Sequence, residues 1–482
     1  MNEDKYEAVI GLEVHAQLLT ESKLFCGDSA RFGGEPNTHV SPVTLGYPGT
    51  LPRLNREAVV LAVKMGIACG CGIEQTNYFA RKNYFYPDLP KGYQITQHTT
   101  PVCKGGSVKI QVAGSAARRV QLNRIHLEED AGKSLHDQDA LNTCIDYNRA
   151  GVPLIEIVSE PDMHSAEEAY AYVTELRKLL RHLNVCDGNM EEGSLRCDAN
   201  VSIRLKGEKG LGTKVEVKNL NSIRNVKKAI EYEIARMIEL AEKGERIIQQ
   251  TRSFDAATDT TFALRTKEEA NDYRYFPDPD LPPFVVTSKM LDAIKATMPA
   301  LPEALVEKYM HQLNLSEYDA RAISDDKEMV DYFEELIRET GHTKAAANWL
   351  LGPVKSYLNE QHESLGSLPV RPPVLARLIQ LVQDGKLSFS VASSKLFHAL
   401  LKSPEADPLQ LATDLNLLQD ADEASVEEWV ESVLAKMPEK VAEYKKGKKG
   451  LIGLFMGEVK KASGGKADPK IATQLLTKKL GS

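Results

Sequence analysis

Long apolar segments, paired cysteines and a targeting signal are all missing from this sequence of 482 residues. No apolar run approaches the ~20 residues that a membrane-spanning helix needs, so we expect no membrane segment. The seven cysteines are odd in number and form no CxxC pair, which favours a reducing compartment over a disulfide framework. The first residues, MNEDKY, have the character of neither a secretory nor a transit peptide. These absences predict a cytoplasmic protein.

The composition is that of an ordinary globular protein, with 42% hydrophobic and 27% charged residues. The length suggests roughly two to four domains of ~100–200 residues each. The formal net charge is −8, but the segment 439–482 holds eleven lysines and only four acidic residues. A basic tail on an acidic body suggests a local contact with a polyanion, although a solvated, lysine-rich helix pair would give the same pattern.

The character of the chain changes twice along its length. Up to a proline-rich stretch at 277–283, the chain consists of segments in which polar and apolar residues alternate and of segments rich in charged and aromatic residues. Helical patterns dominate after that stretch. Two prolines between 404 and 408 indicate a second break. We therefore predict an α+β protein with a sheet-rich catalytic domain at 1–294, a helical domain at 295–405 and a small helical tail at 406–482.

Polar and apolar residues alternate in two runs between 196 and 219, separated by a glycine-containing break. Side chains on a strand alternate between two faces, so Arg196 and Asp198 share one face, and Glu216 and Lys218 extend the pattern in the second run. This predicts a β-hairpin whose polar face carries acids among cations. A merely solvated sheet face would look similar, so the hairpin alone does not decide between the two interpretations.

A carboxylate and an imidazole, Glu13 and His15, project from the same side of a strand predicted near the N-terminus. Both can reach one cation, and Mg²⁺ favours carboxylates together with retained water. An exposed Glu and His on a strand are nevertheless common without any ion.

Three consecutive acids at 128–130 repel one another, which costs stability unless cations or a metal offset their charge. They point to a metal site. The following Gly-Lys-Ser at 132–134 is not a P-loop, because Leu127 stands where that motif needs its first glycine.

Four further segments have simpler expectations. The Gly-, Pro- and Ser-rich stretch 24–55 predicts a long ordered loop, and the aromatic, proline-containing stretch 81–93 predicts a rigid loop or a structural corner. Apolar residues at helical spacing predict core-facing helices at 165–183, opened by a capping box, and at 226–241.

Seven long motifs closely resemble the GatB/GatE family of tRNA-dependent amidotransferase subunits, in family order and across essentially the whole chain. They are VIGLEVH at 9–15, ARKNYFYPD at 80–88, HLEEDAGKS at 126–134, DYNRAGVPL at 146–154, EGSLRCDAN at 192–200, EVKNLNS at 216–222 and DYRYFPDPD at 272–280.

The resemblance implies a cradle-like catalytic domain, a helical domain and a YqeY-like tail that grips tRNA. It also implies a heterotrimer with an amidase (glutaminase) partner and a small third partner, and an internal channel that delivers ammonia. This chain would transfer the γ-phosphoryl of ATP to the side-chain carboxylate of Glu or Asp misacylated on tRNA. Ammonia would then displace phosphate, giving Gln-tRNA(Gln) or Asn-tRNA(Asn). No Ser/His/Asp or Cys/His nucleophile is readable here, which fits a glutaminase in a partner.

Phosphorylating a carboxylate requires cations, because two anions must be held in line. We expect one or two Mg²⁺ ions to be held by a subset of Glu13, His15, Glu128, Glu129, Asp198 and Glu216. We expect nucleotide or substrate binding by Arg196, Lys218, Glu216 and Arg81. We expect the catalytic residues to be Glu13, His15, Glu128, Asp198 and Lys82. The resemblance places Arg81 and Lys82 near the channel mouth, where a lysine could govern ammonia passage.

The chain departs from the family at a zinc site. Many members carry four cysteines in the loop corresponding to 26–44, which suits tetrahedral Zn²⁺. Only Cys26 remains here, with Asp28, Ser41 and Thr44 where the others would stand. We therefore expect no structural zinc.

Two other functions stay open at this point. The chain could be a tRNA-binding scaffold whose complex performs the chemistry elsewhere, or a stand-alone Mg²⁺-dependent phosphotransferase acting on free glutamine. The acid-rich faces favour a ligase component, because a scaffold has no need of them.

Overall fold

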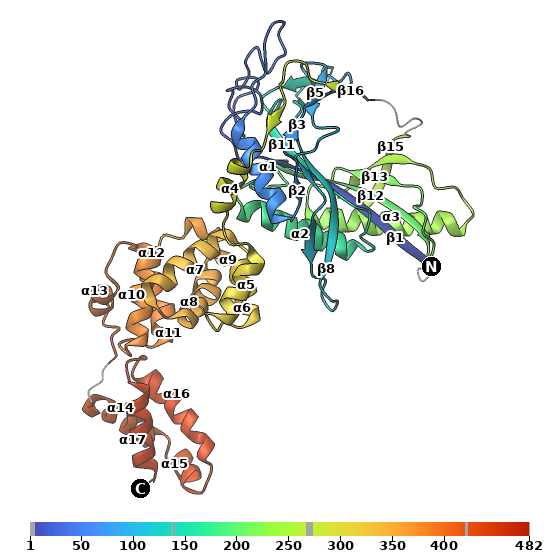
Figure 1. Cartoon of the computed structure of the whole chain (residues 1–482). Coiled ribbons are helices and arrows are strands. Elements are labelled where there is room, and N and C mark those ends of the chain that lie inside the picture. The colour runs from blue at the N-terminus through green and yellow to red at the C-terminus, as the bar shows by residue number, and fades with distance from the viewer. Residues whose placement is uncertain (1–4, 136–137, 140, 267–272, 420–422, 482) are drawn as a thin grey trace. The chain divides into compact units, whose positions relative to one another are not determined.

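The computed structural model describes residues 5–135, 138–139, 141–266, 273–419 and 423–481 (Figure 1). The chain divides into two compact units, Met1–Leu301 and Pro302–Ser482. The first is built around a sheet and the second is helical, so the predicted α+β class is confirmed. In the described parts of the chain, no helix is both long enough and apolar enough to cross a membrane.

Within its described residues, the first unit contains a sheet of 13 strands. Neighbouring strands along its main path are antiparallel, except that β13 and β14 are parallel. The path runs in the order β15 (Thr260–Thr266), β14 (Gln250–Asp255), β13 (Val215–Lys218), β12 (Leu195–Leu205), β1 (Tyr6–Gln17), β11 (Pro153–Ser159), β8 (Arg118–Glu129), β5 (Tyr93–Thr96), β4 (Ala80–Asn83) and β16 (Arg274–Pro277). Off this path lie β2 (Gly72–Ile73), β6 (Cys103–Lys104) and β7 (Ser107–Ile110).

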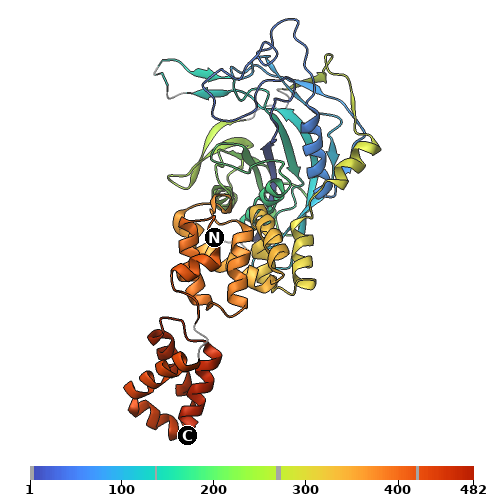
Figure 2. The same ribbon diagram turned by 90° about the vertical axis from the view of Figure 1, so that its left-hand side faces the viewer.

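One face of the sheet is covered by helices α1 (Arg56–Ala68), α2 (Ala166–His182) and α3 (Ile223–Glu242) (Figures 1 and 2). Every second side chain of β1 points into this layer, and Ile10 and Leu12 are fully buried there. Each such side chain contributes ~1.5–3 kcal/mol through its burial. The alternating side chains of the same strands point to the opposite face, which carries the polar residues.

The predicted hairpin and both predicted helices of this unit are confirmed. The Ser165 hydroxyl caps α2 by accepting the backbone N–H of Glu168 at 3.1 Å, and Ser222 caps α3 in the same way. The turn from β13 into α3 passes through Asn219 in the left-handed region, at φ 63°. Asn tolerates that conformation better than most residues, and its side chain also donates to Ser253.

The prediction of a loop throughout 81–93 is wrong at both ends, because its first residues form a strand and Tyr93 begins strand β5. Residues 80–83 form strand β4, which pairs with β5 on one side and β16 on the other. The segment's prolines lie at 87 and 90, so the N–H groups of β4 are intact and can join the ladder. The expectation for 24–55 is confirmed, because the stretch contains no helix and no extended strand.

The described residues of the second unit form two separate hydrophobic clusters, one from Leu305 to Leu417 and one from Val426 to Leu480. Leu301, the end of the first unit, lies seven residues after the predicted domain limit of 294. The first cluster likewise extends beyond 405 because α13 (Pro408–Asp414) buries Ala412 in it.

The first cluster is formed mainly by α5 (Pro302–His311), α6 (Glu317–Ser324), α7 (Lys327–Thr340), α8 (Thr343–Trp349), α9 (Lys355–Gln361), α10 (Pro372–Gln383), α12 (Phe397–Lys402) and α13. The second is formed by α14 (Glu423–Lys436), α15 (Pro438–Lys445), α16 (Ile452–Ala462) and α17 (Pro469–Gly481).

Candidate metal and substrate site

The register of the sheet gathers polar side chains from distant parts of the sequence on the face opposite α1, α2 and α3. Glu13 of β1 lies opposite Asp198 of β12, and His15 lies opposite Glu156 of β11 on its other side. Paired residues of neighbouring strands point to the same face. The pairing of β1 with β12 therefore brings the polar side chains of the N-terminal strand and of the hairpin together on one face.

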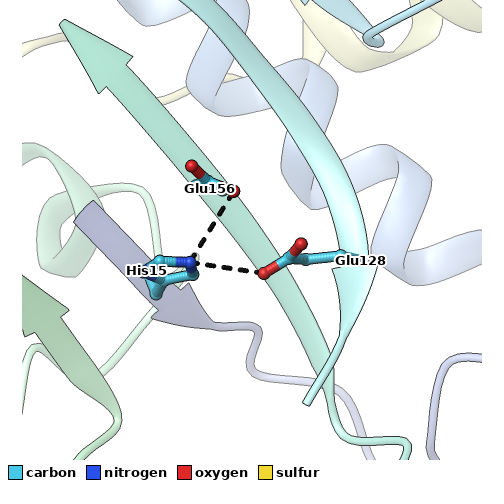
Figure 3. A group of neighbouring side chains, drawn as sticks. All are labelled: His15, Glu128 and Glu156. Carbon is cyan, nitrogen blue, oxygen red and sulfur yellow. Dashed lines mark ion pairs between the residues drawn. The ribbon is translucent and has the colours of Figure 1, made fainter. Parts of the chain in front are cut away.

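His15, Glu128 and Glu156 meet on this face from the three neighbouring strands β1, β8 and β11 (Figure 3). The His15 Nε2 atom is 3.4 Å from Glu128 Oε1 and 3.7 Å from Glu156 Oε2. One ligand atom from each of the three residues lies within 4.8 Å of the others. Among the residues that the structure describes, this is the only group of three or more His, Cys, Asp or Glu side chains close enough to share an ion.

A second histidine balances the charge of the group. His126 Nε2 lies 3.2 Å from Glu156 and 3.6 Å from Glu128. Burial alone would lower its pKa, but the two carboxylates outweigh that effect and raise the pKa of His126 to about 9. Burial would also lower the pKa of His15, but Glu128 and Glu156 raise it above its usual value. The two histidines in turn hold the pKa of Glu128 below its usual range, although burial alone would raise it. The histidines and carboxylates of this buried site thus favour one another's charged forms. A bound cation would take the place of a proton on His15 Nε2, because only a neutral imidazole nitrogen can be a metal ligand.

The donor set fits a divalent cation that keeps open positions. One imidazole nitrogen and two carboxylate oxygens suit Mg²⁺ or Mn²⁺, with water or phosphate oxygens completing the shell. Three protein ligands leave room for a substrate, as catalytic rather than structural sites do. We refer to His15, Glu128 and Glu156 as the metal group.

The hairpin acids lie on the same face but outside this group. Lys218 Nζ is 2.5 Å from Asp198 Oδ2 and 3.2 Å from Glu216 Oε1. These two carboxylates therefore raise the pKa of Lys218, against the effect of its burial. Glu13 accepts a hydrogen bond from Asn200 at 3.0 Å. Burial is the largest effect that raises the pKa of Glu13, and the charges of neighbouring acids, including Asp198, raise it further.

Two other predicted cations border the face. Arg196 is held by Asp130, with Nη2 at 3.0 Å from Oδ1. Lys82 Nζ lies over aromatic rings, 4.6 Å from the centroid of Tyr273 and 5.7 Å from that of Tyr84.

Glu129, which was expected as a metal ligand, and Arg81, which was expected to bind nucleotide or substrate, both lie away from the metal group. Glu129 contacts Lys91 Nζ at 2.6 Å and accepts the backbone N–H of Ile95. Arg81 is paired with Asp278 and with a second acid of the 272–280 motif. Consecutive residues of a strand point to opposite faces, so each lies on the far side of the sheet from its neighbour Glu128 or Lys82. There both line a cavity of about 240 Å³.

The sequence pattern assigns no role to Glu156 or His126. Glu156 is a lone acid in an apolar strand, and that strand predicts only core. The one feature of the sequence that could have pointed to a role for Glu156 was its charge, because a carboxylate in a buried strand requires a partner. Only the pairing of β11 with β1 and β8 shows which partners it has.

A further cavity of about 260 Å³ adjoins Glu13 on the same face. Apolar side chains and polar groups line it together, among them Val9, Leu211, Asn200 and Ser202. An apolar pocket with a few polar groups is the usual form of a small-molecule site.

The residues in place of the family's zinc cysteines are joined by hydrogen bonds. Cys26 Sγ lies 3.3 Å from both Asp28 Oδ2 and Thr44 Oγ1, and Thr44 donates to Asp28 at 2.5 Å. Hydrogen bonds from Thr44 and Ser41 lower the pKa of Asp28 despite the opposing effect of its burial.

The chain is similar to known proteins over nearly its whole length. The GatB/GatE catalytic domain matches residues 8–292, and the GatB domain matches residues 331–480. The B subunit of the aspartyl/glutamyl-tRNA(Asn/Gln) amidotransferase of Thermodesulfovibrio yellowstonii is 48% identical over 474 residues, covering 98% of this chain and 99% of that protein. This chain belongs to the GatB/GatE family.

Other members are equally similar. The corresponding proteins of Geotalea daltonii and of a Thermoanaerobacter species are each 48% identical, over 479 and 476 residues, and cover 99% of both chains. The family resemblance seen in the seven motifs is therefore confirmed over the full length. In this family member, the catalytic domain match contains the whole metal group.

Proposed function

We propose that this chain is the phosphorylating and amide-forming component of a tRNA-dependent amidotransferase. Its substrates would be ATP, ammonia and Glu-tRNA(Gln), Asp-tRNA(Asn) or both. One observation supports this most: the metal group lies on the sheet between a cavity lined by apolar and polar groups on one side and the Lys82 ammonium with its neighbouring aromatic rings on the other. A site in the cytoplasm, where tRNAs are charged, follows from the proposed substrate.

In the first step, an oxygen of the substrate's side-chain carboxylate attacks the γ-phosphorus of ATP, and ADP leaves. His15, Glu128 and Glu156 would hold Mg²⁺, which offsets the negative charge of the phosphates. Lys218 is placed to orient phosphate oxygens or the substrate carboxylate, because its three N–H donors are not all used by Asp198 and Glu216. We assign the cavity of about 260 Å³ beside Glu13 to the nucleoside of ATP, because apolar side chains and a few polar groups line it.

In the second step, ammonia attacks the acyl carbon of the phosphorylated carboxylate, and inorganic phosphate leaves with the C–O bond electrons. The nucleophile must be unprotonated, whereas ammonia in neutral water is mostly ammonium. Delivery from a partner amidase (glutaminase), within a heterotrimer completed by a small third protein, avoids that loss. We propose that the cavity lined by Lys23, Lys91 and Glu129 belongs to this route, because buried polar groups suit a small polar guest.

The scaffold alternative is less well supported by the geometry. Burying two carboxylates and two histidines together costs free energy that a binding platform gains nothing from. A stand-alone phosphotransferase would have to act on free glutamine without an amidase.

Reconstitution with the glutaminase partner tests the proposal. The complex is given ATP, Mg²⁺, glutamine and Glu-tRNA(Gln) or Asp-tRNA(Asn), and both ADP and amidated tRNA are measured. We expect Glu156→Gln to abolish tRNA-dependent ADP formation while the partner still hydrolyses glutamine. Full activity of a folded Glu156→Gln complex would contradict the role of the metal group. Product formed from free glutamine by the isolated chain would favour the phosphotransferase instead.

A further inference from the structure

Four aromatic side chains and one lysine form a partly exposed cluster beside the metal group. The rings of His98 and Tyr275 stack with centroids 4.1 Å apart and an interplanar angle of 14°. Tyr84 and Tyr273 meet edge to face at 5.4 Å, and the Lys82 ammonium lies over both of them. We call these five residues the aromatic shelf.

The strand register places the shelf on the same face as the metal group. Tyr275 of β16 lies opposite Lys82 of β4, and Lys82 lies opposite Gln94 of β5. Two residues further along β5, Thr96 lies opposite Glu128 and donates its hydroxyl to that carboxylate at 3.2 Å. The shelf therefore borders the metal group across β5, at ~4.8 Å per strand.

Electrostatics agree with this short separation. Burial is the largest effect raising the pKa of Tyr275, and the charges of Glu128 and Glu156 raise it further, against the opposing charge of Lys82. The Tyr275 hydroxyl therefore lies within the field of the carboxylates that would hold the cation.

The rings of the shelf are not used up by internal packing. Tyr275 is 38% exposed and Tyr273 is 43% exposed, although both are large aromatic residues. Exposed rings gathered beside a charged site indicate a binding surface rather than a core. Such rings, with a cation among them, are the surface on which proteins stack unpaired bases and hold the adjoining phosphate.

We propose that the aromatic shelf binds the 3′-terminal nucleoside of the aminoacylated tRNA, with its base stacked on the shelf's exposed rings. The inference rests on the proposed function. The reacting carboxylate is joined through the amino acid to the terminal ribose, so once that carboxylate reaches the metal group, the ribose and base lie one amino acid away. The shelf is the aromatic surface at that separation, and Lys82 is placed for the terminal phosphodiester.

The nucleoside of ATP is assigned to the opposite side of the metal group. Glu13 and the cavity next to it lie towards β12, whereas the shelf lies towards β16. The two substrates would thus approach the metal group from opposite sides of the sheet face, as an in-line transfer between them requires.

The test is a binding cycle on the reconstituted complex with its partner proteins. The ligands are two tRNAs that carry Glu at the 3′ end through an amide bond, one with the terminal adenine and one with an abasic terminal ribose. Since stacking a base contributes about 10- to 100-fold to affinity, Tyr275→Ala should weaken binding of the intact tRNA by about that factor. The same substitution should change the affinity of the abasic tRNA by less than about twofold.

Two further variants separate stacking from misfolding. Tyr275→Phe keeps the ring and should bind the intact tRNA like the wild type. Phe276→Ala removes the neighbouring ring of the same strand, which is 46% exposed but points to the other face. It should leave both affinities unchanged.

Each outcome decides the inference. Equal losses of affinity for the intact and abasic tRNAs would overturn it, as would a raised KM for ATP with an unchanged KM for tRNA. The binding cycle requires no turnover, so a wild-type complex that fails to make amidated tRNA would reject the proposed function separately.

Discussion

Glu128 and Glu129 are neighbours in the sequence, yet their carboxylates lie on opposite faces of strand β8. Glu128 lies 3.4 Å from His15 in the metal group, whereas Glu129 is 2.6 Å from Lys91 on the far side. The pleat of the strand separates two chemically identical groups into two environments. One belongs to the proposed phosphorylation site and the other lines a cavity.

Because of this separation, we expect substitution of Glu128 to weaken metal binding and the same substitution of Glu129 to leave it unchanged. Glu128→Gln should weaken Mn²⁺ binding by at least about tenfold, because it removes one of the few anionic ligands of the group. Glu129→Gln should leave the Mn²⁺ affinity unchanged. Titration of the purified chain with Mn²⁺, followed by electron paramagnetic resonance of the free ion, measures both. A Glu129 variant with the larger loss would place the ion on the other face.

A buried charge cluster should contribute strongly to the stability of the first unit. The carboxylate of Glu233 on α3 is fully buried and is held by Arg236 at 2.7 Å, by Arg252 at 3.0 Å and by the Thr261 hydroxyl. Glu233→Ala leaves these partners without their anion and should lower the free energy of unfolding by about 3–5 kcal/mol.

Glu239→Ala on the same helix is the matched control. Glu239 forms an exposed pair with Lys243, one turn along the helix, so its removal should not measurably change stability. Urea unfolding of both variants gives the comparison. Equal midpoints would show that the buried cluster does not stabilise the first unit.

The hydrogen-bonded group around Cys26 should be convertible into a zinc site. Its side-chain ends already meet, with Cys26 Sγ 3.3 Å from Asp28 and Thr44. The triple substitution Asp28→Cys, Ser41→Cys and Thr44→Cys supplies four thiolates, the number that a closed tetrahedral site needs. We expect one Zn²⁺ per purified chain, measured by elemental analysis. The Thr44→Cys chain should retain no stoichiometric zinc, and zinc in the unaltered chain would contradict the expectation of none.

The lysine-rich tail should contribute to tRNA affinity through phosphates. Lys445 and Lys446 are exposed at the end of α15. Each phosphate contact adds roughly 0.7–0.9 to the slope of log affinity against log salt. Replacing both lysines with Ala should therefore lower that slope by about 1–2. The same double replacement of Lys5 and Lys243 in the first unit should not change it. Filter binding over a range of salt concentrations gives the slopes.

Much of the first unit could be predicted from local pattern. The alternation between 196 and 219 specified the hairpin, and helical spacing with a Ser cap specified α2, because these signals act between residues close in the chain. The strand at 80–83 was missed, because its charged and aromatic residues suppress a strand signal that only pairing with β5 and β16 provides. The expectation that Glu129 joins the other acids at the metal group failed because a cluster of acids in sequence does not give the face of each one.

By itself, the sequence determined the family, the α+β class and which residue types could hold a cation, since motifs and alternation are properties of the linear chain. The tertiary structure alone decided that Glu156 completes the metal group, that Asp198 and Glu216 pair with Lys218, and that the aromatic shelf lies beside Glu128. The physical reason is strand register. Pairing β11 between β1 and β8, or β4 between β5 and β16, sets which side chains meet, and that pairing is made by hydrogen bonds between segments far apart in the sequence.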